Sequence, residues 1–461
     1  MLFTDPAQVE KLSRHFYDQH FSTDNALCTP MATQEHLAAI LLNTHAIADS
    51  IVGEGAKPKV MLDLEHLQVA DYATFPPITQ QQQGAIRRLQ GSQPIRTDEM
   101  TYLAFRSLIS FCWDEPQSDA DVARAAAYET ALERVLTEVS QSMAQALAKH
   151  DAPLPYWGRL GFLRVMATIP NEQIKKQNLD RFACVLVKDP VFNARSYHYG
   201  EFGLIGLNFA LEPILKGLNR MLLHFFHTKD LAGPQRMGRA WNCLAPIVAY
   251  FWARGAVAVN RLSPLHLFFD QEAAATAHAI TASQVDFIIR HELGHLVLDH
   301  GRRLRAESGG TKELRHEFEF AADAFAQSSL RSALYSRLRA ELQWSHDSAD
   351  AALSERKGLE ALHNHQRELT GVRLLFIYMD AIDQVGQMLK RRLGDPIRFR
   401  PELDSHPSPR ERLGRLDTFH VGEYAPTSEL IRYAESFFAD TLNYANNLDD
   451  GALAAPLQGL Y

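Results

Sequence analysis

The segment RHELGHLVLDHG, residues 290–301, constrains the fold of this chain more than any other feature. His291 and His295 stand four residues apart, so a helix brings both imidazoles to one face, one turn apart. Two histidines at this spacing can share one zinc ion, and Glu292 beside them can reach a water on the metal. The pattern therefore predicts a helix that carries two metal ligands and a general base.

The residues around this segment predict where the helix begins and ends. Thr281 and Gln284 have the spacing of a capping box, which places the helix start near Thr281. Gly301 suits the position just after a helix, so we expect the helix to end at His300. Gly294 in its middle costs about 1 kcal/mol relative to alanine. That cost predicts the close approach of another backbone, and His300 is expected to support the site from the helix end.

A catalytic zinc ion needs a third protein ligand and an open position for water. The segment HEFEFAADAFA, residues 316–326, lies in a second predicted helix that begins near Thr311. Glu319 and Asp323 share one face of it, among phenylalanines that indicate a buried segment where unpaired carboxylates are costly. We therefore predict Glu319 as the third ligand and Asp323 as the partner of a ligand histidine. Glu313 is the alternative third ligand.

Other histidines favour structural roles. His224 and His227 stand three residues apart in LLHFFHTKD, where the aromatic neighbours favour a packed helix end over a second metal site.

Composition narrows the class of protein. With 461 residues, 46% hydrophobic and 22% charged, the chain has an ordinary globular composition, and a net charge of -8 does not favour nucleic acid. Its cysteines are few, far apart and without a CxxC pair, which predicts neither a thiolate zinc site nor a disulfide framework. The N-terminus lacks the apolar core of a signal peptide, and the apolar stretch 246–259 is too short to span a bilayer. We expect a cytoplasmic protein.

Hydrophobic periodicity predicts a mainly α (α+β) protein with one small sheet. The polar segment FPPITQQQQG, residues 75–84, is predicted to be a connector. We expect a helical region at 1–150, a small sheet within 151–215, a helical insertion at 216–280, the zinc helices and a Pro-rich connector at 281–420, and a C-terminal helix at 421–461.

Four elements together resemble the gluzincin metallopeptidases of the CAAX-prenyl-protease and membrane heat-shock-protease family. HELGHLVLDH and the later EFAAD are similar to the family's HExxH, its additional histidine and its ExxxD. NARSYHYGEFGLIGLNFAL (193–211) is similar to the family's Asn-Ala strand and turn. SHPSPRERLGRL (405–416) resembles its His-Pro-x-x-x-x-Arg element. The four elements appear in the family's order along the chain.

The resemblance implies a zincin-like core that binds one Zn²⁺ ion through His291, His295 and Glu319. Glu292 would take a proton from the zinc-bound water and pass it to the leaving amine. His406 would donate to the oxyanion.

The resemblance also implies where a peptide substrate binds. Asn193 and Ala194 would lie near the cleft, and the strand at 202–208 would offer an edge to which an extended peptide adds. Arg412 would lie near the substrate and hold the connector through a carboxylate, or lie at the surface.

The chain departs from this family in ways that bear on its substrate. It has no predicted spanning helix, and its first 150 residues match none of the family's elements, so prenylated substrates are not implied. The leading prediction is a zinc-dependent endopeptidase that acts on a cytosolic protein. The alternatives are a catalytically silent zinc-binding regulatory protein on a peptidase fold, and a zinc hydrolase of a non-peptide amide.

Overall fold

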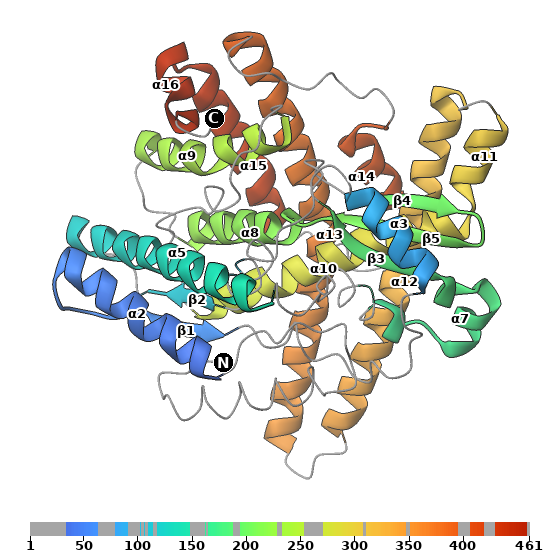
Figure 1. Ribbon diagram of the computed structural model, residues 1–461, viewed down its shortest axis with the longest axis horizontal. Helices are drawn as coiled ribbons and strands as arrows, with labels where there is room; N and C mark the ends of the chain where they lie inside the picture. The colour runs from blue at the N-terminus through green and yellow to red at the C-terminus, as the bar shows by residue number, and fades with distance from the viewer. Residues whose placement is uncertain are drawn as a thin grey trace.

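A computed structural model confirms the predicted fold class: the chain is mainly helical and has two small sheets (Figure 1). The structure describes residues 34–62, 79–90, 102, 106, 109–113, 118–147, 162, 165–187, 194–227, 233–252, 271–307, 310–346, 351–394, 406–418 and 429–458.

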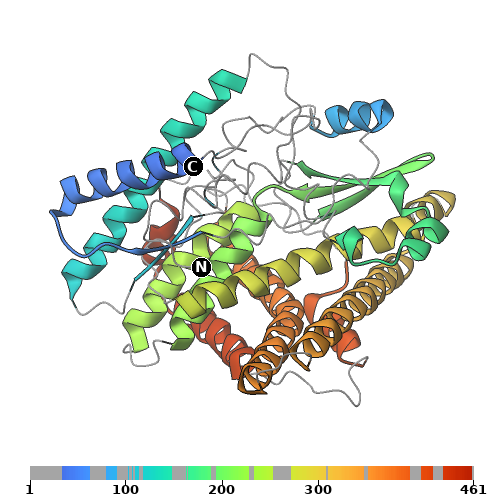
Figure 2. The same cartoon turned by 90° about the horizontal axis from the view of Figure 1, so that it is seen from below.

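The N-terminal part forms a unit away from the larger sheet. Helix α2 (Gln34–Val52) packs against α5 (Asp119–Leu147), and strands β1 (Lys59–Leu62) and β2 (Ile109–Cys112) pair antiparallel. Figures 1 and 2 both show this unit on the side of the molecule opposite the three-stranded sheet.

The three-stranded sheet has the order β3-β5-β4. Strand β3 (Phe182–Val187) runs parallel to β5 (Phe202–Asn208), and β4 (Ala194–Tyr199) runs antiparallel to it. The expected edge at 202–208 is therefore wrong, because β5 is the central strand and is paired on both sides. The edge strand is β4, which packs against the helix that carries His291 and His295.

A helix covers the sheet where a connector was predicted. Helix α3 (Gln80–Gln90) packs its buried Ala85 and Ile86 on β3 and β5. Thr79 and Gln82 form a reciprocal cap: the Thr79 amide donates to Gln82 Oε1 at 2.9 Å, and the Gln82 amide donates to Thr79 Oγ1 at 3.2 Å. The predicted connector is thus wrong from Gln80 onward, because this capping pair starts a helix within the glutamine run. Residues 75–78 lie outside the described part.

The other face of the sheet lies on a helical core. It consists of α8 (Leu211–His227), α9 (Gly233–Trp252), α10 (Gln271–Val297), α12 (Lys312–His346), α13 (Ala351–Leu393) and α15 (Glu429–Asn446), all of which bury side chains in one apolar cluster. Shorter helices are α7 (Asn171–Gln177), α11 (His300–Ala306), α14 (Pro409–Thr418) and α16 (Asp450–Ala454). Figure 2 shows α10 passing between the sheet and the helices α12 and α13.

Helices α10 and α12 approach closely at Gly294. A Cβ atom at this position would lie 3.2 Å from the Cα atom of Ala322 and 3.1 Å from the Phe325 ring. The predicted close approach of another backbone is confirmed, and it brings the two helices that carry the predicted ligands together.

The predicted start of the zinc-motif helix is wrong. Helix α10 begins at Gln271, so Thr281 and Gln284 lie inside it and are buried. Their side-chain oxygens accept hydrogen bonds from the Asn219 amide of α8 at 2.8 and 2.9 Å, and Tyr378 of α13 donates to Asn219 at 2.7 Å. The Thr-x-x-Gln pattern therefore joins three helices in the core instead of capping one.

The predicted end of this helix at His300 is also wrong. Helix α10 ends at Val297, and Asp299 adopts a left-handed conformation with φ of 56°. His300 then begins the separate helix α11, so Gly301 lies in the first turn of α11 and does not follow a helix.

Two further expectations from the sequence concern disulfide bonds and membrane-spanning helices. Cys112, Cys184 and Cys243 are free thiols. None of the helices in the described ranges combines the length and apolar character that crossing a membrane requires.

Candidate metal centre

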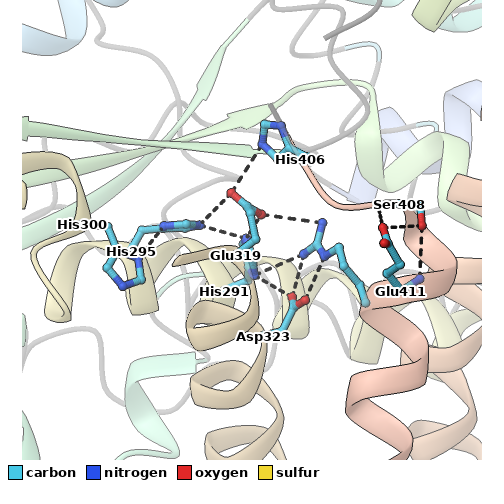
Figure 3. A network of polar contacts seen from close by, with 9 residues as sticks. His291, His295, His300, Glu319, Asp323, His406, Ser408 and Glu411 are labelled. Carbon is cyan, nitrogen blue, oxygen red and sulfur yellow. Dashed lines mark hydrogen bonds and ion pairs between the residues drawn. The ribbon is translucent and has the colours of Figure 1, made fainter. Parts of the chain in front are cut away.

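Helices α10 and α12 bring the three predicted metal ligands together (Figure 3). The Nε2 atoms of His291 and His295 are 3.1 Å apart. Glu319 Oε2 lies 3.4 Å from His291 Nε2, and Glu319 Oε1 lies 3.5 Å from His295 Nε2. All potential ligand atoms fall within 4.8 Å of one another. Within the part of the chain that the structure describes, this is the one such group of histidine, cysteine or acidic side chains.

The donor set fits a metal ion. Glu319 is buried, and its Oε2 atom makes no hydrogen bond within the described residues. A buried carboxylate oxygen without a donor is costly, and a cation bound between the two imidazoles would remove that cost. The alternative ligand Glu313 is exposed and lies outside the group.

His291 is held by a carboxylate and an arginine. Its Nδ1 atom lies 2.9 Å from Asp323 Oδ1. Arg412 donates to both oxygens of Asp323, at 2.6 and 2.8 Å, and its Nη1 atom lies 3.8 Å from Glu319. Burial disfavours the charged forms of His291 and Asp323. For His291 the hydrogen bond with Asp323 outweighs this effect and raises the pKa to about 9, and for Asp323 the charge of Arg412 outweighs it and lowers the pKa.

His295 is held differently, by another histidine. Its Nδ1 atom lies 2.9 Å from His300 Nδ1. His300 is buried and stacks on Phe318, with ring centroids 4.2 Å apart, and Arg303 packs over the same ring. Burial lowers the pKa of His295 to about 3 and that of His300 to about 4, so both rings are neutral at pH 7.

Glu292 lies beside the ligands and faces the sheet. It is buried, and burial raises the pKa of its carboxyl group to about 7, although a hydrogen bond with Ser196 of β4 favours the charged form. The contact of Ser196 with Glu292 was not predicted. A serine within a strand does not indicate which helix the strand packs against.

The downstream element also reaches the site. His406 Nε2 lies 3.4 Å from Glu319 Oε1, and about half of its side chain is exposed. Ser408 and Glu411 cap helix α14 reciprocally, as Figure 3 shows, and this helix directs Arg412 inward, where the whole residue is 3% exposed.

The remaining predicted residues are placed as follows. Ala194 begins the edge strand β4 and is buried opposite Leu207, and Asn193 lies outside the described residues. His224 is buried edge-on against the ring of Phe225 and is not part of the metal group.

Comparison with known proteins adds one relationship. The model of the family described as Peptidase U49 matches residues 262–384. This range contains all of α10 and α12, and therefore Glu292 and the three candidate ligands. The match supports a peptidase role. No curated protein and no solved structure was found to match the chain.

Proposed function

We propose that this protein is a zinc-dependent endopeptidase of the gluzincin type, with His291, His295 and Glu319 as ligands of one Zn²⁺ ion. The observation that carries the proposal is the convergence of these three side chains around a buried carboxylate oxygen that makes no hydrogen bond within the described residues, next to Glu292. In known zinc peptidases, two histidines and a glutamate bind the metal, and a fourth position is open to water. The peptidase family match covers the same helices.

The chain's own groups divide the work around the metal. When bound, zinc supplies Lewis acidity, which makes a coordinated water acidic near neutral pH and polarises a carbonyl group. Glu292 accepts the proton of the attacking water and returns it to the leaving nitrogen. His406, close to Glu319 and half exposed, donates to the developing oxyanion.

Asp323 and His300 orient the two ligand histidines. We assign Arg412 a positioning role as well, because its guanidinium is buried and donates to both oxygens of Asp323.

The substrate is proposed to be an extended segment of a cytosolic protein. Strand β4 pairs with β5 on one side only among the described strands, so its other edge can accept a peptide as an additional strand. Ala194 at the start of β4, and Asn193 before it, would contact this peptide. The free cysteines agree with the reducing compartment that the sequence predicts.

A comparison of new protein N-termini tests this function. Cells producing the wild-type protein should contain N-termini that are absent when Glu292→Gln is produced at the same level. Metal analysis of the purified proteins is the control, because Glu292→Gln leaves all three ligands in place and should bind zinc as the wild type does.

The two alternatives give different results in the same comparison. A silent zinc-binding regulator would produce the same cellular effect with either protein. A hydrolase of a non-peptide amide would lose its effect in Glu292→Gln without any difference in protein N-termini. Either result contradicts the endopeptidase proposal.

A further inference from the structure

We infer that His198, on the edge strand β4, is a positioning residue for the metal ligand His295, and that it acts through Gly301 and His300. The inference rests on the metal site of the proposed function and concerns residues that this function does not use. It links the strand proposed to receive the substrate with one of the metal ligands.

The hydrogen bond between His295 and His300 depends on which ring nitrogen of His295 carries the proton. Its Nε2 atom faces the metal group, so the neutral ring must carry its proton on Nδ1 for Nε2 to offer a lone pair. That Nδ1–H group lies 2.9 Å from His300 Nδ1 and donates to it. His300 therefore keeps its own proton on Nε2, and its place determines the orientation of the ligand ring.

The helix is interrupted between His295 and His300, which lets the two rings meet. In a continuous helix, a residue five positions on is rotated by roughly 140° from the first, so the two rings would point apart. Asp299 in the left-handed conformation ends the helix, and α11 begins at His300. This conformation costs a non-glycine residue on the order of 1 kcal/mol, which surrounding contacts must offset.

The ring of His198 packs against the first turn of α11, at Gly301. The ring of His198 occupies the space that a Cβ atom on residue 301 would need, so only glycine fits there with the ring in place. His198 Nδ1 also lies 3.7 Å from Asp299 Oδ1. The buried Nε2 atom of His198 makes no hydrogen bond within the described residues, so packing on Gly301 and the contact with Asp299 hold the ring.

These contacts form a continuous path. His198 touches Gly301 and Asp299, which flank His300, and His300 bonds the ligand His295. A displacement of β4 at His198 is thereby transmitted to the ligand ring, whereas His291 has no comparable connection to β4 in the contacts described above.

The test measures metal binding directly and needs no substrate. The full-length protein is loaded with Co²⁺, whose visible absorption reports ligand geometry, and zinc affinity is measured by competition with a chelator. Gly301→Ala should change the cobalt spectrum and weaken zinc binding about tenfold, the lower end of the loss when a partner of a ligand histidine is disturbed.

A second substitution makes the test specific for the His198 contact. His198→Ala alone should weaken zinc binding about threefold, less than the loss expected when a ligand's own partner is replaced. His198→Ala combined with Gly301→Ala should bind zinc as His198→Ala does, because the new methyl group no longer meets a ring. Gly414→Ala is the matched control, since nothing lies within 4 Å of a Cβ atom at this helical glycine; it should bind metal as the wild type does.

His300→Phe keeps the test decisive if Gly301→Ala fails to fold. Phenylalanine retains the ring that stacks on Phe318 and lacks the Nδ1 acceptor, so zinc binding should weaken about tenfold. The inference is overturned if Gly301→Ala and His300→Phe keep the wild-type spectrum and affinity, or if the double variant adds the two single losses. A wild-type protein that binds neither ion overturns the proposed zinc site itself, together with this inference.

Discussion

The two proposed ligand histidines, His291 and His295, lie on the same face of α10, yet they are held in place by different means. His291 is oriented by the carboxylate of Asp323, which is itself bonded by Arg412 from a helix nearly ninety residues downstream. His295 is oriented by His300, a neutral ring five residues further along the chain. One half of the site therefore depends on buried charge, and the other depends on a backbone break and packing.

The two halves of the site differ in which contacts they can lose without a large cost in free energy. Removing one member of the Arg412–Asp323 pair leaves a buried charge without its closest partner, which is costly for the whole fold. Replacing His300 by a ring that still stacks on Phe318 takes away a single hydrogen bond between uncharged rings, which costs less. The predictions below test this contrast, beginning with the residue that both halves share.

Glu319 faces both histidines, so Glu319→Gln should affect the two halves equally. Replacing the carboxylate by an amide removes the anionic ligand, and zinc affinity should fall more than about 100-fold, beyond the loss typical of a ligand's partner. Chelator competition measures this loss. Glu317→Gln, an exposed glutamate two positions earlier, is the control. Equal zinc binding by Glu319→Gln and the wild type would show that Glu319 is not a ligand.

Arg412→Met should destabilise the His291 half more than any change in the His295 half. It removes the guanidinium that bonds both oxygens of buried Asp323 and leaves this carboxylate with His291 alone, so the free energy of unfolding of the metal-free protein should fall by about 3–5 kcal/mol. Urea unfolding followed by circular dichroism measures it. Arg410→Met on the same helix is the control: the Arg410 side chain is 74% exposed in its ion pair with Asp380, so the change should be under about 1 kcal/mol. Similar losses in both variants would contradict the assigned burial of Arg412.

Asp323→Asn and His300→Phe compare the two halves directly. Asp323→Asn removes the charge that holds His291 and takes the closest anion away from Arg412, so zinc affinity should fall by close to 100-fold, the upper end of the range for such partners. His300→Phe should stay near tenfold, the lower end. Isothermal titration with zinc under chelator competition ranks the two variants. The reverse order would show that the neutral partner matters more than the charged one.

Gly294→Ala should lower the free energy of unfolding, because the new methyl group pushes α10 away from α12, the two helices that carry both halves of the site. The new methyl group would lie 3.2 Å from the Ala322 backbone, which overpacks the interface and should cost about 1–3 kcal/mol in unfolding free energy. The melting temperature of the metal-free protein measures the effect. An unchanged melting temperature would mean that the helices can part without cost.

Residue spacing along the chain was enough to predict the local part of the site. The spacing of His291 and His295, and that of Glu319 and Asp323, places each pair on one face of a helix whatever the rest of the chain does. Gly294 in a helix interior indicated the close backbone contact that Ala322 provides. These features follow from helix geometry and need no knowledge of distant residues.

How these local elements join depends on contacts between segments that are distant in the sequence. Thr281 and Gln284 have the pattern of a cap, but Asn219, more than sixty positions earlier, turns them into a junction between helices. Likewise, β4 became the edge strand because β3 pairs with β5, and α10 ends early at a left-handed Asp299 beside His198. Each outcome depends on a contact between segments far apart in sequence, which spacing and periodicity along one segment do not encode.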